Sequence, residues 1–252
     1  MDSFRCKQFE VFQEGVAMRV NTDGVLLGAW VSLHSVSDVE VPVVLDIGTG
    51  SGVIALMLAQ RLFERNGALD FHIDALEPHA SSAQAAAHNF IISPWSCAIQ
   101  GFECTLQDFV SQRKALENNT QYDFIVSNPP YFKDSLRPPV QERCLVRHTD
   151  LLSSVDLLRG VADLLKPSGL FGVVLPFLQQ KDFVKTALSV GLHLCRETTL
   201  YTLPERSPKR ILMEFSKKEE PLVSDSLLIH DSDYKSFSEE YVKLVKPFFL
   251  AF

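Results

Sequence analysis

The chain has 252 residues, of which 46% are hydrophobic and 22% charged, and its formal net charge is −7. This composition is that of an ordinary globular protein with enough apolar material for a large core, and in the absence of internal repeats it fits one α/β domain with appendages. The negative charge argues against a general polyanion-binding surface, although a local basic patch is compatible with it.

Neither a membrane segment nor an export signal is expected. No apolar run reaches the roughly 18 residues of a membrane span, and the first ten residues, MDSFRCKQFE, lack the basic start and apolar core of a signal peptide. The five cysteines are dispersed, with no CxxC pair or metal-ligand spacing, which favours reduced thiols in a cytoplasm. We therefore expect a cytoplasmic protein, and nothing in the sequence calls for a bound metal or an obligatory protein partner.

The N-terminal arm is expected to form a hairpin and a short helix. Apolar residues alternate with other residues over 9–11 and over 16–20, and a turn signal at Glu14-Gly15 separates the two runs. Residues 21–24, NTDG, form a turn and helix-start signal, and residues 25–30 begin a helix.

Strands then alternate with helices. A β-branched run ends in the glycine-rich sequence GTGSG, and an apolar helical segment follows it. This order repeats along the chain, which predicts a mostly parallel sheet covered on both faces, with an antiparallel pair at one edge. We expect strands at residues 41–47, 71–77, near 102–106, 122–127, 170–176, 192–203 and 209–215, and helices at 53–65, 78–90, 150–165, near 181–190 and at 239–250.

The glycine-rich turn is a candidate ligand site. In open α/β sheets ligands bind at the carboxyl ends of the strands, and Gly48, Gly50 and Gly52 let a ligand approach the main chain closely. The dinucleotide pattern G-x-G-x-x-G/A fails because Val53 occupies the last position, and no G-x-x-x-x-G-K-[ST] loop is present. The turn therefore favours a ligand that is not held by a pyrophosphate; a tight structural turn is the alternative.

Two acids follow the next strands. Glu77 ends the second expected strand, where a carboxylate can accept hydrogen bonds from both hydroxyls of a ribose. Asp108 follows the third, where it can accept from an adenine amino group. Each could alone be a surface acid, but their recurrence favours a ligand with adenine and ribose.

The fourth expected strand ends in Asn128, Pro129, Pro130 and Tyr131. Pro129 keeps Asn128 extended, and neither proline offers an N–H. The Asn128 side-chain oxygen and the Pro129 carbonyl are acceptors suited to a substrate NH2 group, and Tyr131 offers a face on which a planar group can stack. The alternative is a rigid turn capped by an aromatic residue.

Two segments are locally basic. Either could be a solvated loop, or it could bind phosphates. The candidate RNA-binding residues are Lys133, Arg137, Arg143 and Arg147 in the first segment, and Arg206, Lys209 and Arg210 in the second.

Together the sequences VVLDIGTGSG, LEP and VSNPPYF resemble the class I S-adenosylmethionine-dependent methyltransferases, in the branch that methylates planar amino or amide nitrogens. The resemblance implies a Rossmann-like, seven-stranded fold with a core at residues 41–217, an N-terminal part at 1–40 and a C-terminal extension at 218–252. It implies catalytic roles for the Asn-Pro-Pro-Tyr residues. The implied cofactor-binding residues are Asp46, Gly48, Gly50, Gly52, Glu77, Pro78 and Asp108.

A closer resemblance covers nearly the whole chain. The N-terminal pattern FxVxQxGxAMRVNTDGVLLGAW, with NPPYF and the C-terminal YxxEY and FFL, is similar to the bacterial tRNA-valine adenine-N6 methyltransferases. This resemblance implies a tRNA substrate, methylation of adenine 37 beside the anticodon, and cofactor contacts from Thr22 and Asp23.

Other classes fit less well. Release-factor glutamine-N5 methyltransferases share Asn-Pro-Pro-Tyr but carry an N-terminal helical bundle, whereas only about 40 residues precede the first core strand here. Guanine-N2 rRNA methyltransferases usually carry an extra domain. An NAD-dependent oxidoreductase is disfavoured by Val53, and a catalytically silent cofactor-binding module by the intact Asn-Pro-Pro-Tyr motif.

Overall fold

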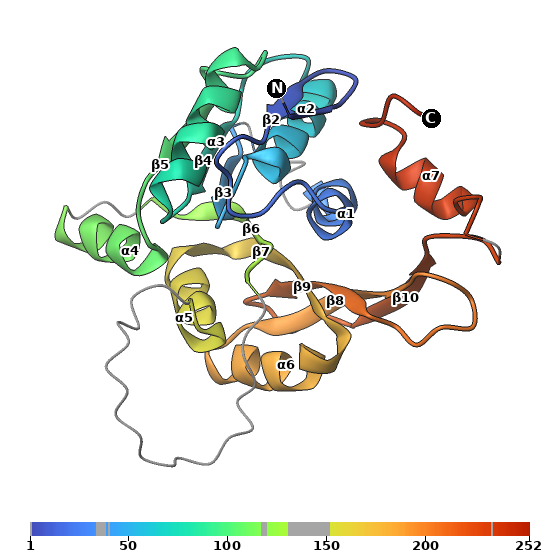
Figure 1. Ribbon diagram of the computed structural model, residues 1–252. Coiled ribbons are helices and arrows are strands. Elements are labelled where there is room, and N and C mark those ends of the chain that lie inside the picture. Colours follow the sequence, from blue (N-terminus) through green and yellow to red (C-terminus); the bar gives the residue numbers. More distant parts are fainter. Residues whose placement is uncertain (1, 34–38, 40, 117–119, 131–151, 233) are drawn as a thin grey trace, which may run out of the picture.

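The computed structural model describes residues 2–33, 39, 41–116, 120–130, 152–232 and 234–252. A central sheet lies between two groups of helices (Figure 1). No helix in these ranges combines the length and the apolar character that crossing a bilayer requires.

Within the described residues the central sheet has eight strands in the spatial order β10-β8-β9-β7-β6-β3-β4-β5. Neighbours from β7 to β5 run parallel, whereas β9 is antiparallel to both β7 and β8. The predicted α/β class, with a mostly parallel sheet and an antiparallel pair, is confirmed. The strands are β3 (Val43–Ile47), β4 (His72–Leu76), β5 (Ile99–Phe102), β6 (Tyr122–Ser127), β7 (Leu165–Pro176), β8 (His193–Tyr201), β9 (Arg210–Ser216) and β10 (Val223–Leu228).

Helices cover both faces of this sheet. One apolar core lies between the sheet and α1, α2, α3 and α7, and a second lies between the sheet and α4, α5 and α6. Successive strand residues point to opposite faces, so Val44 joins the first core and Leu45 the second. The helices are α1 (Thr22–Trp30), α2 (Val53–Asn66), α3 (Ala80–Ile92), α4 (Leu106–Ala115), α5 (Ser154–Leu164), the 3-10 helix η2 (Phe177–Gln179), α6 (Gln180–Ser189) and α7 (Glu239–Val245).

The N-terminal hairpin differs from the expected one. Strand β1 (Ser3–Arg5) pairs with β2 (Glu10–Phe12), and residues 16–20 form no strand. The prediction that pairs 9–11 with 16–20 is therefore wrong. Backbone N–H groups of the second run bond to side chains instead: Ala17 to Ser82 Oγ at 3.0 Å and Val20 to Gln13 Oε1 at 2.7 Å.

Other boundaries also differ from expectation: β7 begins at Leu165 instead of residue 170, and α7 ends at Val245 instead of residue 250. The third core strand is Ile99–Phe102, not 102–106, because Thr105 caps α4 and so ends the extended segment. In the C-terminal extension, β10 adds a strand parallel to β8, and α7 packs against the first core. The chain ends come together, since Lys7 N–H donates to Phe248 O at 2.8 Å.

Gly172 in β7 is required by close packing. A Cβ atom at this position would lie 2.7 Å from Val31 Cγ1 and 3.3 Å from Phe124 Cζ, and both of these side chains are fully buried. We expect Gly172→Ala to lower the free energy of unfolding by about 1–3 kcal/mol, as overpacking of a core does. Urea unfolding measures this change.

Gly101→Ala is the matched control for that variant. Gly101 also lies in a strand, but its added Cβ would be 3.5 Å from Phe90, an ordinary contact. We expect its stability to stay within about 0.5 kcal/mol of the parent protein. Equal losses in the two variants would contradict the packing argument.

Candidate active site

Three parallel strands end side by side at one edge of the sheet. The register pairs Ile47, the last residue of β3, with Leu76 of β4 and with Ser127 of β6. The next residue of each strand is therefore at the same edge: Gly48, Glu77 and Asn128. Carboxyl ends of parallel strands are where open α/β sheets bind ligands.

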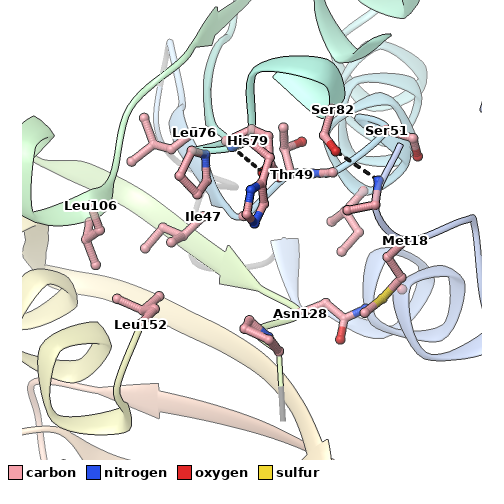
Figure 2. Close-up of a pocket in the computed structure, with 18 of the residues that line it drawn as sticks. Met18, Ile47, Thr49, Ser51, Leu76, His79, Ser82, Leu106, Asn128 and Leu152 are labelled. Carbon is pink, nitrogen blue, oxygen red and sulfur yellow. Dashed lines mark hydrogen bonds between the residues drawn. The ribbon is translucent and has the colours of Figure 1, made fainter. Parts of the chain in front are cut away.

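A cavity of about 800 Å³ lies at this edge. Its volume is within the range of small-molecule sites. Figure 2 shows its wall, in which residues from distant parts of the chain face one another. The lining residues include Ala17 to Asn21, Gly24, Gly48 to Ser51, Glu77 to His79, Ser82, Cys104 to Asp108, Asn128, Pro130, Leu152 and Asp156.

The glycine-rich turn exposes its backbone to this cavity. Gly48, Gly50 and Gly52 all have positive φ, at 74°, 57° and 85°, which only glycine adopts readily. A Cβ atom at Gly48 or Gly50 would meet nothing within 4 Å, so open space lies beside the main chain. The N–H groups of Gly48 and Thr49 both donate to Leu76 O at 2.9 Å, which fixes the turn to the end of β4.

Asp46 supports the turn from behind. Its carboxylate is fully buried, and Oδ2 accepts a hydrogen bond from Thr49 Oγ1 at 2.6 Å. Burial raises the pKa of Asp46 to about 7, with a smaller contribution from nearby Glu77. Asp46 is not among the residues that line the cavity, and Oδ1 has no hydrogen-bond partner among the described residues.

Glu77 joins the end of β4 to the turn. Its side chain is buried, Oε2 accepts from Gly50 N–H at 2.9 Å, and Oε1 accepts from His79 N–H at 3.0 Å. A carboxylate has about four lone-pair sites, so both oxygens can also accept hydroxyl donors from the cavity. Pro78, beside it, lines the same wall.

Asp108 lines the cavity from the first turn of α4, where it is exposed. Its N–H donates to Thr105 Oγ1 at 3.1 Å, and Thr105 Oγ1 donates to Asp108 Oδ2 at 2.7 Å. One carboxylate oxygen is thus used in capping the helix, and the other can accept from a ligand.

Asn21 and Gly24 are the residues of the NTDG segment that line the cavity. Asn21 caps α1 by accepting from Gly24 N–H at 2.9 Å. Thr22 and Asp23 are not among the lining residues. Asp23 Oδ2 instead pairs with Arg210 Nε at 2.6 Å.

The end of β6 projects its amide into the cavity wall. Ser127 Oγ donates to Ile47 O at 2.8 Å and so holds the strand end against β3. Asn128 and Pro130 line the cavity, and Pro129 is buried. The Asn128 side chain lies beside α1, since a Cβ atom at Gly24 would lie 3.5 Å from Asn128 Nδ2.

The predicted basic residues fall into two groups. Arg206 and Lys209 are exposed on the loop between β8 and β9, and Arg210 is held by Asp23. Tyr131, Lys133, Arg137, Arg143 and Arg147 lie outside the described residues.

The cavity also has a wall that the sequence patterns did not indicate. Ala17 to Val20 and Ser82 line it, although none of them carries a charged or aromatic signature apart from Arg19. The nearest signal was the position of residues 17–20 directly before NTDG, which alternation alone had assigned to a hairpin.

Fold and site together have the features of a class I methyltransferase: a Rossmann-like sheet, a glycine-rich turn, an acid after the next strand and an Asn-Pro-Pro end to β6. In the described part of the chain, no group of three or more His, Cys, Asp or Glu side chains could hold a metal ion.

Comparison with known proteins gives the family. Residues 28–175 match the family model described as methyltransferase small domain. A curated tRNA1(Val) (adenine(37)-N6)-methyltransferase from Bacteroides fragilis is 42% identical, covering 98% of this chain and 97% of its own. One of the same name from Trichodesmium erythraeum is 38% identical, covering 100% and 99%.

The fold also matches solved structures. The crystal structure of a predicted O-methyltransferase from Agrobacterium tumefaciens has a TM-score of 0.63 at 16% identity, covering 89% of this chain and 96% of its own. The chain belongs to the methyltransferase small domain family. Its methyl donor is S-adenosylmethionine.

The cavity fits this donor in size and chemistry. It offers a backbone open to close approach at Gly48 and Gly50, and a buried acceptor at Glu77. These are the groups that a ligand with an amino acid part and a ribose requires.

The raised pKa of Asp46 predicts a pH-dependent stability. Asp46 binds its proton more tightly in the folded protein than in the unfolded chain. The folded protein therefore becomes less stable as the pH rises from 3.8, the ordinary pKa of this group, to about 7. Asn at this position cannot titrate. We therefore expect the melting temperature of Asp46→Asn, relative to the parent protein, to increase between pH 5 and pH 8. A difference that stays constant over this range would contradict the raised pKa.

Proposed function

We propose that this methyltransferase transfers a methyl group to N6 of an adenine in tRNA, at position 37 beside the anticodon of a tRNA for valine. The observation that carries this proposal is the similarity over nearly the full chain to curated relatives with that name. We further propose that the enzyme acts in the cytoplasm and needs no protein partner.

In this proposal, different residues of the cavity wall bind different parts of the donor. Main-chain groups from Gly48 to Ser51 hold the amino acid part, and Gly52, which does not line the cavity, shapes the turn by donating its N–H to Thr49 O. Asp46 supports the turn through its hydrogen bond with Thr49. Glu77 accepts from the ribose hydroxyls and Pro78 packs beside it, while the uncapped oxygen of Asp108 accepts from the adenine amino group. Asp23 acts indirectly, by fixing the first turn of α1 through its ion pair with Arg210, and Thr22 is the first residue of that helix.

When bound, S-adenosylmethionine supplies the methyl group that is transferred. Asn128 and Pro129 orient the nitrogen that receives it: the Asn128 side-chain oxygen and the Pro129 carbonyl accept hydrogen bonds from the two N–H groups of adenine N6. An exocyclic amine is a poor nucleophile because its lone pair is delocalised into the ring. Two fixed acceptors favour a more pyramidal nitrogen and stabilise the positive charge that develops on it.

The proton balance needs no strong base. The nitrogen gains a methyl group and, carrying positive charge, releases one of its two protons. The positively charged nitrogen is acidic enough to give its proton to water, while the Asn128 and Pro129 oxygens keep the nitrogen oriented. Pro130 keeps the backbone without a competing N–H donor at the same place.

The target adenine must leave its stack to reach Asn128. Enzymes that act on a base extrude it at an energetic penalty of a few kcal/mol, which is smaller in a loop than in a duplex. Tyr131, the last residue of the Asn-Pro-Pro-Tyr motif, is the residue we assign to stack against the extruded base.

Basic residues supply the contacts to RNA phosphates. Arg206 and Lys209 are exposed on the β8–β9 loop. Strand β7 is parallel to β6, and β9 is antiparallel to both β7 and β8, so β8 runs in the same direction as β6. The β8–β9 loop therefore lies at the edge of the sheet where β6 ends. Arg210 anchors this loop to α1. Lys133, Arg137, Arg143 and Arg147 are proposed as a second group on sequence grounds.

A methyl-transfer assay tests the proposal. Total tRNA that lacks the modification is incubated with the enzyme and labelled S-adenosylmethionine, and nucleosides are then identified by mass spectrometry. We expect N6-methyladenosine from position 37 of a valine tRNA. Label in guanosine, or in a release-factor glutamine when that protein is offered, would overturn the tRNA adenine assignment.

Substitutions of Asn128 test its role. Asn128→Leu keeps the approximate size of the side chain but removes the acceptor, and we expect kcat to fall by about 10²–10³-fold, as for loss of one preorganised partner. Asn128→Asp retains acceptor oxygens and should keep more activity. Both should bind S-adenosylhomocysteine as the parent does in calorimetry. Near-parental turnover of the Leu variant would show that the amide does not orient the nitrogen.

Salt dependence tests the β8–β9 loop. Each phosphate contact contributes roughly 0.7–0.9 to the slope of log K against log salt. Replacing both Arg206 and Lys209 with Gln should reduce that slope for tRNA binding by about 1.5. Lys114→Gln, at an exposed residue of α4 paired with Asp163, is the control and should leave the slope unchanged. An unchanged slope in the double variant would make the loop a solvated surface.

A further inference from the structure

Asn89 is a buried amide in the interior of α3 that bonds to two distant segments. It is fully buried, and its Oδ1 accepts from Phe12 N–H at 2.9 Å. Its Nδ2 donates to Phe12 O at 3.0 Å and to Ser51 O at 2.9 Å. One side chain thus joins β2 to the glycine-rich turn.

The residue type matches this geometry. Asn is a poor residue for a helix interior, and a buried amide without partners is strongly unfavourable. Here the amide oxygen and both amide N–H groups are hydrogen-bonded. The amide exchanges a pair of hydrogen bonds with the N–H and C=O of Phe12, as two paired strands do, and its second N–H donates to Ser51 O. An apolar residue at position 89 would leave three buried or partly buried backbone groups of Phe12 and Ser51 without these partners.

The next residue of α3 fixes the same turn by packing. A Cβ atom at Gly52 would lie 2.5 Å from Phe90 Cε1, so the Phe90 ring fills the space beside Gly52. Asn89 and Phe90 therefore hold two consecutive turn residues, Ser51 and Gly52, one by a hydrogen bond and one by contact.

Helix α3 also bonds to the N-terminal segment that lines the cavity. Ser82 lies two helical turns before Asn89, is 1% exposed, and accepts from Ala17 N–H at 3.0 Å (Figure 2). Ala17, Ser51 and Ser82 all line the cavity, whereas Asn89 does not. The helix is therefore bonded to both the turn and the N-terminal segment between which the cavity lies.

We infer that Asn89 is a positioning residue for the methyl donor: it sets the distance between the glycine-rich turn and residues 12–20 without contacting the donor itself. The inference rests on the proposed position of the donor in this cavity, and it does not depend on the RNA target. Loss of Asn89 weakens donor binding because the two walls are no longer held together.

Calorimetry with S-adenosylhomocysteine on the full chain tests this role. Asn89→Asp keeps the shape and the acceptor but lacks both N–H donors, and we expect its Kd to rise roughly tenfold, as for loss of hydrogen bonds to buried groups. In steady-state assays the KM for S-adenosylmethionine should rise by a similar factor, with the KM for tRNA and the kcat at saturating donor close to parental values.

Ser93→Ala is the matched control. Ser93 is the buried C-cap residue of α3, four positions after Asn89; its Oγ donates to Phe90 O at 2.8 Å, and neither Ser93 nor Phe90 lines the cavity. This variant should lose stability in urea unfolding yet keep the Kd for S-adenosylhomocysteine within about twofold of the parent value.

The outcomes are distinguishable. If the parent protein itself fails to bind S-adenosylhomocysteine, the proposed donor site is wrong. If it binds but folded Asn89→Asp has the parental Kd, or if the KM values for both substrates rise equally, the positioning role is overturned. If Asn89→Asp does not fold, Asn89→Ser keeps a small polar side chain but lacks the amide that bonds to both Phe12 and Ser51; a Kd for S-adenosylhomocysteine raised about tenfold supports the inference, and an unchanged Kd overturns it.

Discussion

The parallel pairing of β3 with β4 on one side and β6 on the other is the constraint on which the site depends. Because all three strands stay in register to their last residues, the glycine-rich turn, Glu77 and Asn128 emerge at one edge. Hydrogen bonds across this edge then fix the loops: Leu76 O receives two N–H groups of the turn, Glu77 receives a third, and Ser127 Oγ bonds Ile47 O.

Buried polar side chains complete what the strands begin. Asp46, Glu77 and Asn89 are each less than a tenth exposed, and each bonds to the turn or its neighbours. Burial of these polar side chains is unfavourable unless they are hydrogen-bonded. Their hydrogen bonds to Thr49, Gly50 and Ser51 restrict the conformation of the glycine-rich turn, as expected of a site that must orient two reacting groups.

The order of the core strands was readable from the sequence, because parallel strands are buried on both faces and appear as continuous apolar runs between glycine and proline signals. Helix α4 was not expected, since its sequence LQDFVSQRKA is largely polar and only Leu106 and Phe109 are buried. The same logic failed for residues 16–20, whose alternation resembles a strand although their N–H groups bond to side chains such as Ser82, 65 positions away. It also missed β10, whose sequence VSDSLL is polar because most of that edge strand is exposed. The cavity-lining residues at strand ends were predictable by position, whereas Asn89 was not: within an alanine-rich helix it reads as a surface residue, and its partners are 77 and 38 positions away.

The central claim is that the edge formed by β3, β4 and β6 holds the methyl donor with its reacting end toward Asn128. A crystal structure of the complex with S-adenosylhomocysteine tests this claim directly. We expect both ribose hydroxyls within hydrogen-bonding distance of Glu77, the homocysteine along Gly48 to Ser51, and the sulfur facing Asn128. Density for the ligand outside this cavity, or a ribose that does not reach Glu77, would contradict it.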